Sequence, residues 1–560
     1  MTENVNKVAI KPLTSLKRPL WVLVTALLIM IIFDQVTWEK QFGVQFFLIT
    51  LLLLIGLFLL TTSEKKKVPW KSILLLVPIL LGSIMTIFRR EMSTTFFNIV
   101  LTLLSLLVLA LTFLSGSWLS YRFRDLLTGI LRLAQSVFIS PVSALVKKHK
   151  TSEETGSGGK KERWNKVKPF LRGLLIAIPI LIVLGALLAS ADLVFQNRLS
   201  NLFDWLKIEN LGEIIWRTIY IVILTYLLAG AFIHALTISA EKKTLGEEKP
   251  WIKPFLGTTE AFIVLGLVNL LFLSFIIIQF RYFFAGTANI SVEGFTYAEY
   301  ARRGFFELVA VALISLGLFY LLSQFTKRAE PKIKRVFSIL GILLMLQVGC
   351  MLVSAFQRLS LYEAAYGFTT LRTITHIFMI WLSVLLLAVT LMEIFNQFKR
   401  MALVLFLVFF GFTLTLNVVN VDRFIARQNI QHAIAGNPLD AEYLVRNLSN
   451  DGIPELFKYL EADRTPQNIK NALSATLACD YIAENQKEGS DFWSEWHFSD
   501  AKAGNLFTDA KDDLESFPFI IREEEYVDLV EGTEENVLVN DYFILVDGKE
   551  IWCTSEMIDQ

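Results

Sequence analysis

Blocks of about 20 consecutive apolar residues recur along the chain and constrain its fold more than any other feature. A membrane-spanning helix needs about this length to cross a hydrocarbon core of roughly 30 Å. Lipid offers the backbone no hydrogen-bond partners, and the blocks lack the alternating pattern of barrel strands. The sequence therefore predicts an all-α polytopic membrane protein with about eleven transmembrane helices. We expect the spans near residues 20–35, 42–61, 71–88, 96–115, 171–190, 213–236, 258–280, 304–325, 335–356, 371–395 and 401–420.

The charged residues divide the chain into two parts of opposite sign. Residues 420–560 contain 11 Lys and Arg against 29 Asp and Glu, out of totals of 53 and 52. Subtraction leaves 42 basic and 23 acidic residues before position 420. Such a separation indicates that the two parts face different surroundings.

Lysine and arginine collect in every second connection between the predicted spans, for example at residues 65–67 and 327–335. Short cytoplasmic loops carry this excess. We therefore expect a multi-pass protein of the plasma membrane with its amino terminus inside and its acidic carboxyl-terminal region outside. Arg89 and Arg90 are exceptions, because their connection is expected outside. The first apolar run reaches Asp34 without a cleavage site and is interpreted as a signal anchor.

The pattern predicts five regions. Residues 1–115 form an N-terminal four-helix membrane region, and 116–168 form a cytoplasmic amphipathic segment with a charged linker. A seven-helix membrane core follows at 169–420. Residues 421–515 are expected to be a helical extracytoplasmic region, and 516–560 a β-rich C-terminal module, which together make a small α+β domain.

Breaker residues divide the carboxyl-terminal region into elements. Helices are expected to end near Asp451-Gly452 and Thr465-Pro466, and strands to follow Pro518. Asp547-Gly548 between two apolar runs predicts a hairpin. Cys479 and Cys553 would be able to pair outside the cytoplasm, and two free thiols are an equally open alternative.

The sequence contains no recognised catalytic or metal-binding pattern. Its five histidines form neither H-x-x-x-H nor H-E-x-x-H, and no G-x-S-x-G is present. "GSGGKK" lacks the spacing and the preceding strand of a phosphate loop. We therefore predict no cofactor, no metal and no nucleic acid partner, and assign no catalytic residue. The expected partners are the lipid bilayer and a protein that binds the carboxyl-terminal domain.

Charged and aromatic residues gather in two stretches, "GFTYAEYARRGFFEL" (294–308) and "RLSLYEAAYGFTTLR" (358–372). Ionisable residues inside a span are costly, by roughly 2.5–3.5 kcal/mol at a helix centre, and tend to face the bundle or water. Glu307 lies about 12 Å further along a helix than Glu299, so we expect it to need a partner. The candidate outer-face polar cluster comprises Tyr297, Glu299, Arg302, Arg303, Glu307, Arg358, Tyr362, Glu363, Tyr366 and Arg372.

Structural roles explain part of this cluster. Thr296-x-x-Glu299 and Ser360-x-x-Glu363 have the spacing of capping boxes, and the tyrosines suit the aromatic belt of a membrane. A functional site and a structural ion-pair network are both open. We expect the two motifs to meet at the outer membrane boundary.

The two motifs also carry a resemblance. Together with the preceding "NLLFLSFIIIQFRYFF", they are similar to the prokaryotic multi-pass membrane family called domain of unknown function 4173 (DUF4173), over roughly residues 170–435. The resemblance implies an uncharacterised protein of the cell membrane and brings no activity and no residue roles with it.

Three classes of function are open. The first is an envelope sensor or scaffold that binds a partner or ligand on the extracytoplasmic side, and it accounts for more of the chain than the other two. The second is a transporter or transporter subunit with an outward-facing charged vestibule. The third is a membrane enzyme acting on a lipid or envelope precursor, with Glu299, Glu307 or Glu363 as acid or base and Arg302, Arg303 and Arg372 on phosphate. A protein that is not an enzyme is favoured.

Overall fold

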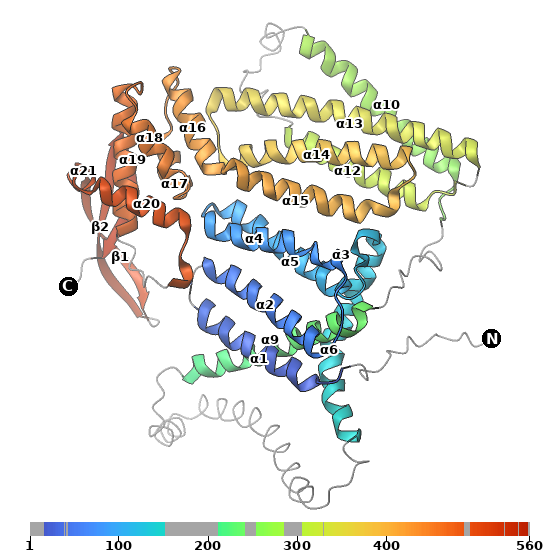
Figure 1. Cartoon of the computed structure of the whole chain (residues 1–560). Coiled ribbons are helices and arrows are strands. Elements are labelled where there is room, and N and C mark those ends of the chain that lie inside the picture. Colours follow the sequence, from blue (N-terminus) through green and yellow to red (C-terminus); the bar gives the residue numbers. More distant parts are fainter. Residues whose placement is uncertain are drawn as a thin grey trace, which may run out of the picture. The chain divides into compact units, whose positions relative to one another are not determined.

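The chain is a multi-pass helical membrane protein with a small sheet near its carboxyl end (Figure 1). The computed structural model describes residues 16–38, 40, 43–151, 211–240, 254–284, 305–328, 330–485, 493–530, 533–546 and 548–557. Within these residues, 10 helices are long and apolar enough to cross a membrane. They confirm ten of the predicted spans. The span expected at 171–190 lies outside the described residues.

The chain divides into two compact units, and each is built from separated stretches of sequence. One unit contains Met1–Gln35, Gly56–Lys66 and Leu131–Ile238, and the other contains Val36–Ile55, Lys67–Ile130 and Ser239–Gln560. The boundaries fall inside α1 (Pro19–Thr37), α2 (Val44–Ser63), α6 (Phe123–Thr151) and η3 (Ile238–Ala240), so these helices contribute to both units.

Polar contacts hold the first unit together between α1 (Pro19–Thr37) and α9 (Leu211–Thr237). Asp34 is 2% exposed, although it lies in an apolar helix. The guanidinium of Arg217 lies 2.6 Å from its carboxylate, and the Tyr220 hydroxyl donates to the same group. Arg217 also pairs with Glu213 one turn earlier, at 3.1 Å. The charge of Asp34 is therefore compensated from a neighbouring helix.

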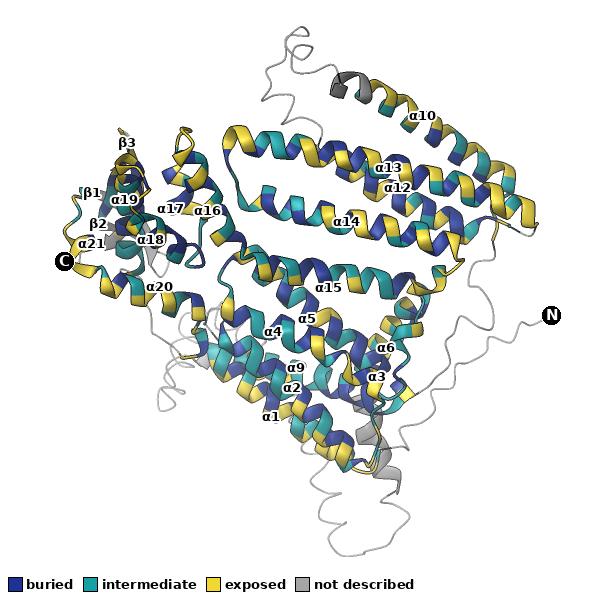
Figure 2. Ribbon diagram, turned by 45° about the horizontal axis from the view of Figure 1, so that its top comes forward, coloured by how far each residue is buried: buried dark blue, intermediate teal, exposed yellow. Residues whose placement is uncertain are grey.

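The membrane helices of the second unit form a continuous series of contacting neighbours (Figures 1 and 2). α4 contacts α5, α5 contacts α15, and α15, α14 and α13 follow in turn, with α12 and α10 against α13. Their close approach needs glycine at Gly411, where a Cβ atom would lie 2.0 Å from the Trp381 ring. The elements are α3 (Trp70–Ile73), α4 (Leu76–Phe88), α5 (Met92–Thr112), η1 (Ser117–Ser120), η3 (Ile238–Ala240), α10 (Thr258–Phe284), α12 (Phe305–Phe325), α13 (Pro331–Tyr366), α14 (Thr370–Ile394), η6 (Phe398–Arg400) and α15 (Met401–Val419).

Short helices and a three-stranded antiparallel sheet complete the second unit. The strands follow the order β1-β2-β3, and β2 pairs with β3 from Val546 opposite Lys549. Gly548 in that turn has a φ of 78°, as the predicted hairpin requires. The elements are α16 (Val421–Ile434), α17 (Ala441–Asn447), α18 (Ile453–Glu461), α19 (Gln467–Asn485), η7 (Trp493–Glu495), α20 (Phe498–Asp509), α21 (Lys511–Glu515), β1 (Ile520–Val530), β2 (Thr533–Val546) and β3 (Lys549–Met557). The predicted breaks before α18, α19 and β1 are confirmed.

A disulfide joins the sheet to the helices. Cys479 of α19 is bonded to Cys553 of β3, which resolves the alternative left open by the sequence. Ile544 and Ile551 of the sheet are buried beside the pair. A cross-link over 74 residues of chain stabilises a fold by about 4 kcal/mol in the chain-entropy description.

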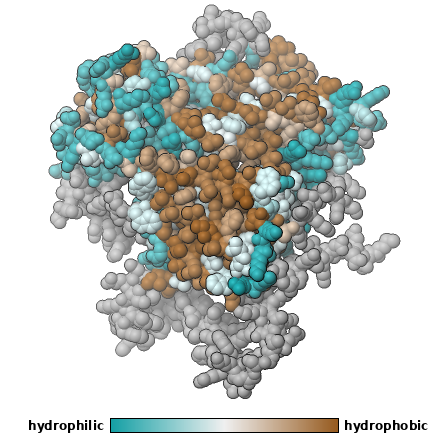
Figure 3. All heavy atoms as spheres, viewed as in Figure 1, coloured by the Kyte–Doolittle hydropathy of each residue, from teal (hydrophilic) through white to brown (hydrophobic). Residues whose placement is uncertain are grey.

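The surface follows the same division between membrane and water. Apolar side chains cover the faces of the membrane helices, whereas hydrophilic residues gather over the carboxyl-terminal helices and sheet (Figure 3). Exposed Leu267, Ile314 and Leu387 on the outward faces of α10, α12 and α14 are 62%, 70% and 60% accessible, as lipid contact requires.

The buried pair in the first unit yields a prediction. Arg217→Leu should destabilise the protein by about 3–5 kcal/mol, because it leaves the buried Asp34 carboxylate without a counter-charge. The midpoint of SDS-induced helix loss, followed by circular dichroism, measures the change. Glu213→Gln is the matched control and should cost under about 1 kcal/mol, since that pair is partly exposed. The double variant Asp34→Asn/Arg217→Leu should recover most of the loss. Equal effects of Arg217→Leu and Glu213→Gln would contradict this account.

Candidate functional site

The second Tyr/Glu/Arg motif lies where α13 ends and α14 begins. The Arg372 guanidinium lies 4.2 Å from the centre of the Tyr362 ring and donates to a carbonyl of the connecting turn at 2.6 Å. The rings of Tyr362 and Tyr366 are 5.0 Å apart. Glu363 is 3% exposed, and His376 Nδ1 lies 3.0 Å from its carboxylate. The structure thus brings together Tyr362, Glu363, Tyr366 and Arg372, with Arg358 one turn earlier on α13, and it adds His376.

The first motif is described only at its end. Tyr297, Glu299, Arg302 and Arg303 lie outside the described residues, so the expected meeting of the two motifs stays a prediction. Glu307 lies in the first turn of α12, where a carboxylate interacts favourably with the helix dipole. It is exposed and forms no ion pair with any residue that the structure describes, so the expected partner is missing there.

The predicted capping box at Ser360 and Glu363 is wrong. α13 runs without a break for 36 residues, from Pro331 to Tyr366, so both residues lie near its carboxyl end. The Ser360 hydroxyl donates to the carbonyl of Phe356 within the helix, and Glu363 faces His376 of α14. Residues three apart also lie on the same face in the middle of a helix, so this spacing does not by itself identify a helix start.

Asp451, in the turn between α17 and α18, forms several polar contacts near the carboxyl ends of α4 and α15. The residue is 5% exposed. Its carboxylate accepts hydrogen bonds from the backbone N–H groups of Arg90 at 2.8 Å and of Glu91 at 3.1 Å. Ser499 of α20 donates its hydroxyl at 2.9 Å, and the Arg89 guanidinium lies 3.7 Å away. Asp451 therefore fastens the carboxyl-terminal helices to the loop between two membrane helices.

The same loop is also bonded to the last membrane helix. Arg89 donates to the carbonyl of Asn417 at 2.6 Å. The side-chain amides of Asn417 on α15 and Asn98 on α5 exchange hydrogen bonds at 3.1 and 2.7 Å, with both residues buried. Glu91 caps α5 by accepting the N–H groups of Ser93 and Thr94.

A second attachment joins α16 and α17 to the turn between α13 and α14. The Asn429 side chain accepts from the N–H of Phe368 at 2.6 Å and donates to its carbonyl at 2.9 Å. The hydroxyl of Tyr443 accepts from the N–H of Thr370 at 2.8 Å. Gly367, with a φ of 75°, admits this approach, because a Cβ atom there would lie 2.8 Å from Asn429 Oδ1.

Asp422 lies between the two attachments, three residues after the last span. It is fully buried, and one carboxylate oxygen accepts from the backbone N–H and the hydroxyl of Ser449. Its other oxygen has no hydrogen-bond partner in the described structure. The pKa of Asp422 is raised from 3.8 to about 7, mainly by burial. The nearby charges of Glu91 and Asp451 raise this pKa further, whereas the hydrogen bonds from Ser449 lower it.

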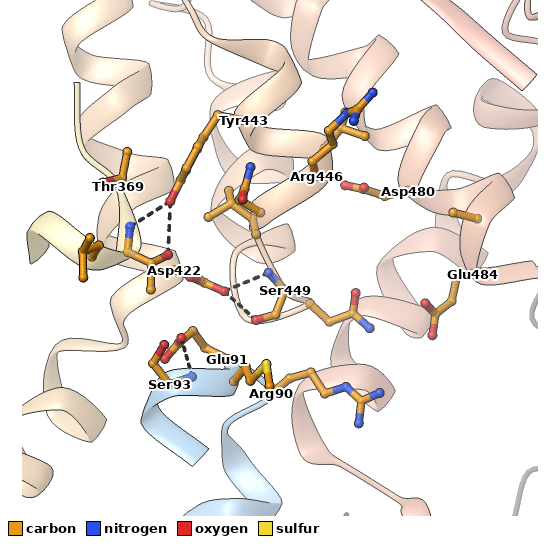
Figure 4. Close-up of a pocket in the computed structure, with 18 residues that line it drawn as sticks. Arg90, Glu91, Ser93, Thr369, Asp422, Tyr443, Arg446, Ser449, Asp480 and Glu484 are labelled. Carbon is orange, nitrogen blue, oxygen red and sulfur yellow. Dashed lines mark hydrogen bonds between the residues drawn. The ribbon is translucent and has the colours of Figure 1, made fainter. Parts of the chain in front are cut away.

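A cleft of about 630 Å³ opens beside Asp422 (Figure 4). We call it the junction cleft, because the α4–α5 loop and the start of α14 form one side and α16, α17 and α19 form the other. Charged and hydroxyl groups dominate its lining. Its polar side chains come from Arg90, Glu91, Ser93, Thr369, Thr370, Asp422, Tyr443, Arg446, Asn447, Ser449, Asn450, Asp480 and Glu484. Among the residues that the structure describes, no group of three or more His, Cys, Asp or Glu side chains is arranged to hold a metal ion.

Sequence reasoning missed this junction. It treated Arg89 and Arg90 as exceptions to the charge rule and Asp451 only as the end of a helix. The available signal was the run Arg89-Arg90-Glu91 in a two-span connection, opposite a carboxyl-terminal region rich in carboxylates. Arg90 also lies 3.8 Å from Asp500 of α20, so both arginines face acidic partners.

The raised pKa of Asp422 yields a prediction about pH. The folded state holds the Asp422 proton up to about pH 7, whereas the unfolded state releases it near pH 4. Asp422 therefore makes stability fall as the pH rises from about 4 to 7, by on the order of 4 kcal/mol. Asp422→Asn keeps an oxygen for Ser449 and should become progressively more stable than the wild type as the pH rises over this range. Thermal unfolding in detergent at pH 5, 6, 7 and 8 measures the difference; a difference that does not change with pH would contradict it.

Comparisons with known proteins assign the chain to a family and give it no activity. No curated protein and no solved structure matches the chain. The family model that matches is described as "Domain of unknown function (DUF4153)" and covers residues 76–459. A family of unknown function is therefore confirmed, whereas its expected identity as DUF4173 is corrected. The matched residues include Arg89, Asp422 and Asp451, and the chain belongs to the DUF4153 family.

Proposed function

We propose that the protein is an envelope sensor or scaffold whose carboxyl-terminal region binds a polar ligand or partner on the extracytoplasmic side. The observation that carries the proposal is the junction cleft. Its walls come from membrane helices and from the carboxyl-terminal helices. A molecule bound there contacts both parts, and its binding energy can favour one arrangement of the junction over another.

The bonds around the cleft suit this role. Thr370 at the start of α14 is bonded to Tyr443 of α17, and Asp451 is bonded to the loop between α4 and α5. A displacement of α17 or of the α17–α18 turn therefore acts directly on the ends of membrane helices. Clefts at such boundaries, with a few polar groups that fix orientation, are common positions for ligand sites.

The orientation in this proposal has the amino terminus inside the plasma membrane and the carboxyl terminus outside. Lysine-rich connections on the opposite side support it. The Cys479–Cys553 disulfide adds support, because disulfides form and persist outside reducing compartments. The pairing of Arg89 and Arg90 with Asp451 and Asp500 accounts for two basic residues on the expected outer side.

A transporter with a charged vestibule is the second candidate, and one observation favours it. Glu363 of α13 is buried and pairs with the partly buried His376 of α14. Ionisable groups inside membrane bundles often belong to proton or ion pathways. The carboxyl-terminal region, however, has no evident part in such a pathway. A membrane enzyme that uses Glu363 and Arg372 has the same weakness.

The sensor proposal is tested by complementation of a deletion strain. Arg446 lines the cleft and is about half exposed, and among the described residues its one ion pair is with Glu442 on its own helix. Arg446→Glu should reverse the charge there without loss of fold, and it should abolish most of the growth rescue under envelope stress. Arg464→Glu, at an exposed position outside the cleft, is the matched control and should rescue as the wild type does.

Protein amounts in the membrane must be equal for this comparison. Full rescue by Arg446→Glu and by a chain lacking 421–560 would contradict the sensor proposal. If Glu363→Gln alone removed the rescue, the transporter would be favoured instead.

The orientation has a separate test. Intact cells with Cys350→Ser should show no labelling by a membrane-impermeant maleimide, because the two remaining cysteines are paired. After mild reduction, two labels should appear on each chain without lysis. Labelling that requires lysis would place the carboxyl-terminal region inside and overturn the proposed orientation.

A further inference from the structure

A second cavity, of about 580 Å³, lies on the other side of the Asp451 turn, beside the end of α15. We call it the basic groove, because five basic side chains line it. They are Arg89, Arg423, Arg427, Lys458 and Lys502.

The groove keeps a positive charge after its internal pairs are counted. Its two acidic residues, Asp451 and Glu455, are already engaged. Asp451 accepts from the α4–α5 loop and Ser499, and Glu455 accepts from Arg423 at 2.9 Å and Lys458 at 2.7 Å. Five basic against two acidic residues leave three positive charges, and the side chains of Arg423 and Lys458 are still 50% and 60% exposed.

Arg427 and Lys502 are exposed and form no ion pair in the part of the chain that the structure describes. Three basic residues elsewhere in the region are paired with acidic side chains. Arg446 pairs with Glu442, Lys511 with Glu515 and Arg522 with Glu550. Four of the 11 basic residues between 420 and 560 thus gather in one cavity of a strongly acidic region. Like charges held together repel one another, and an anion would relieve that repulsion.

The groove opens at the level where the membrane spans end. Val418, in the last turn of α15, is 76% exposed and lines it. Phe88 at the end of α4 and Phe498 of α20 line it too, are 38% and 47% exposed, and have ring centres 5.4 Å apart. Apolar residues beside basic ones at a span end suit the boundary between acyl chains and headgroups.

We propose that the basic groove binds a phosphate-bearing anion at the membrane surface, and that the headgroup of an acidic phospholipid supplies it. Arginine forms paired hydrogen bonds with phosphate oxygens, and lysine contributes a mobile point charge. The acyl chains of such a lipid would lie against Val418 and Phe88. This inference is independent of any ligand in the junction cleft.

The test uses the full chain in nanodiscs of phosphatidylcholine, with or without phosphatidylglycerol. The groove variant is Arg427→Gln/Lys502→Gln, which changes two exposed residues and breaks no ion pair among the described residues. Its matched control is Arg464→Gln/Lys549→Gln, an exposed arginine and an exposed lysine outside the groove that form no ion pair among the described residues. Arg427→Lys/Lys502→Arg preserves the charge and should behave as the wild type does.

Phosphatidylglycerol should raise the unfolding temperature of the wild type and of the control more than that of the groove variant. Native mass spectrometry should show its retention weakened by roughly tenfold in the groove variant. A second arm adds glycerol 3-phosphate to phosphatidylcholine nanodiscs. If glycerol 3-phosphate stabilises the wild type as much as the lipid does and fails to stabilise the groove variant, that result would support the anion site and assign it to a soluble phosphate. Equal lipid retention by wild type and groove variant, without a response to glycerol 3-phosphate, would overturn the proposal.

Discussion

One buried carboxylate, that of Asp451, attaches the carboxyl-terminal helices to the loop between the membrane helices α4 and α5. Asp451 is buried, and a carboxyl group removed from water needs several hydrogen-bond donors. Two of those donors are backbone N–H groups of the α4–α5 loop, so the same hydrogen bonds hold both the loop and the Asp451 carboxylate in place. Because the donors come from α20 and from a membrane loop, neither part can satisfy Asp451 alone.

This constraint explains two exceptions in the charge pattern. Arg89 and Arg90 lie in a connection where the charge pattern predicts few basic residues. Arg89 faces Asp451 and Arg90 faces Asp500, so their charges belong to an interface and carry little information about topology. Arg217 has a similar role in a different set of helices, where its guanidinium pairs with the carboxylate of Asp34. In both places an arginine at a span end is explained by a specific carboxylate.

The periodicity and length of the apolar runs predicted the membrane spans. They predicted few of the side-chain contacts between helices. Ten of the eleven predicted spans are confirmed, because each is a local run of apolar residues. The hairpin at Gly548 was equally local. The Asp451 junction joins residues about 360 positions apart, as its bond to Glu91 shows, and no local pattern reveals such a pairing. The capping box at Ser360 failed for a related reason: its spacing is local, but the partner of Glu363 is His376 on the next helix.

The junction cleft and the basic groove share a border, and this has an energetic consequence. Asn450 lines both cavities, and the adjoining residues Ser449 and Asp451 hold Asp422 in one direction and the α4–α5 loop in the other. Occupants of the two cavities would therefore act on the same short turn. If an anion in the groove favours one position of that turn, it must alter the affinity of the cleft, and a cleft ligand must alter the affinity for the anion by the same factor. Coupling of this kind requires no long path through the protein, because the two sites meet at three consecutive residues. The size of the coupling depends on how differently each occupant contacts the turn in its two positions. Asp422 would respond first to a movement of the turn, because its buried carboxyl group is hydrogen-bonded to Ser449.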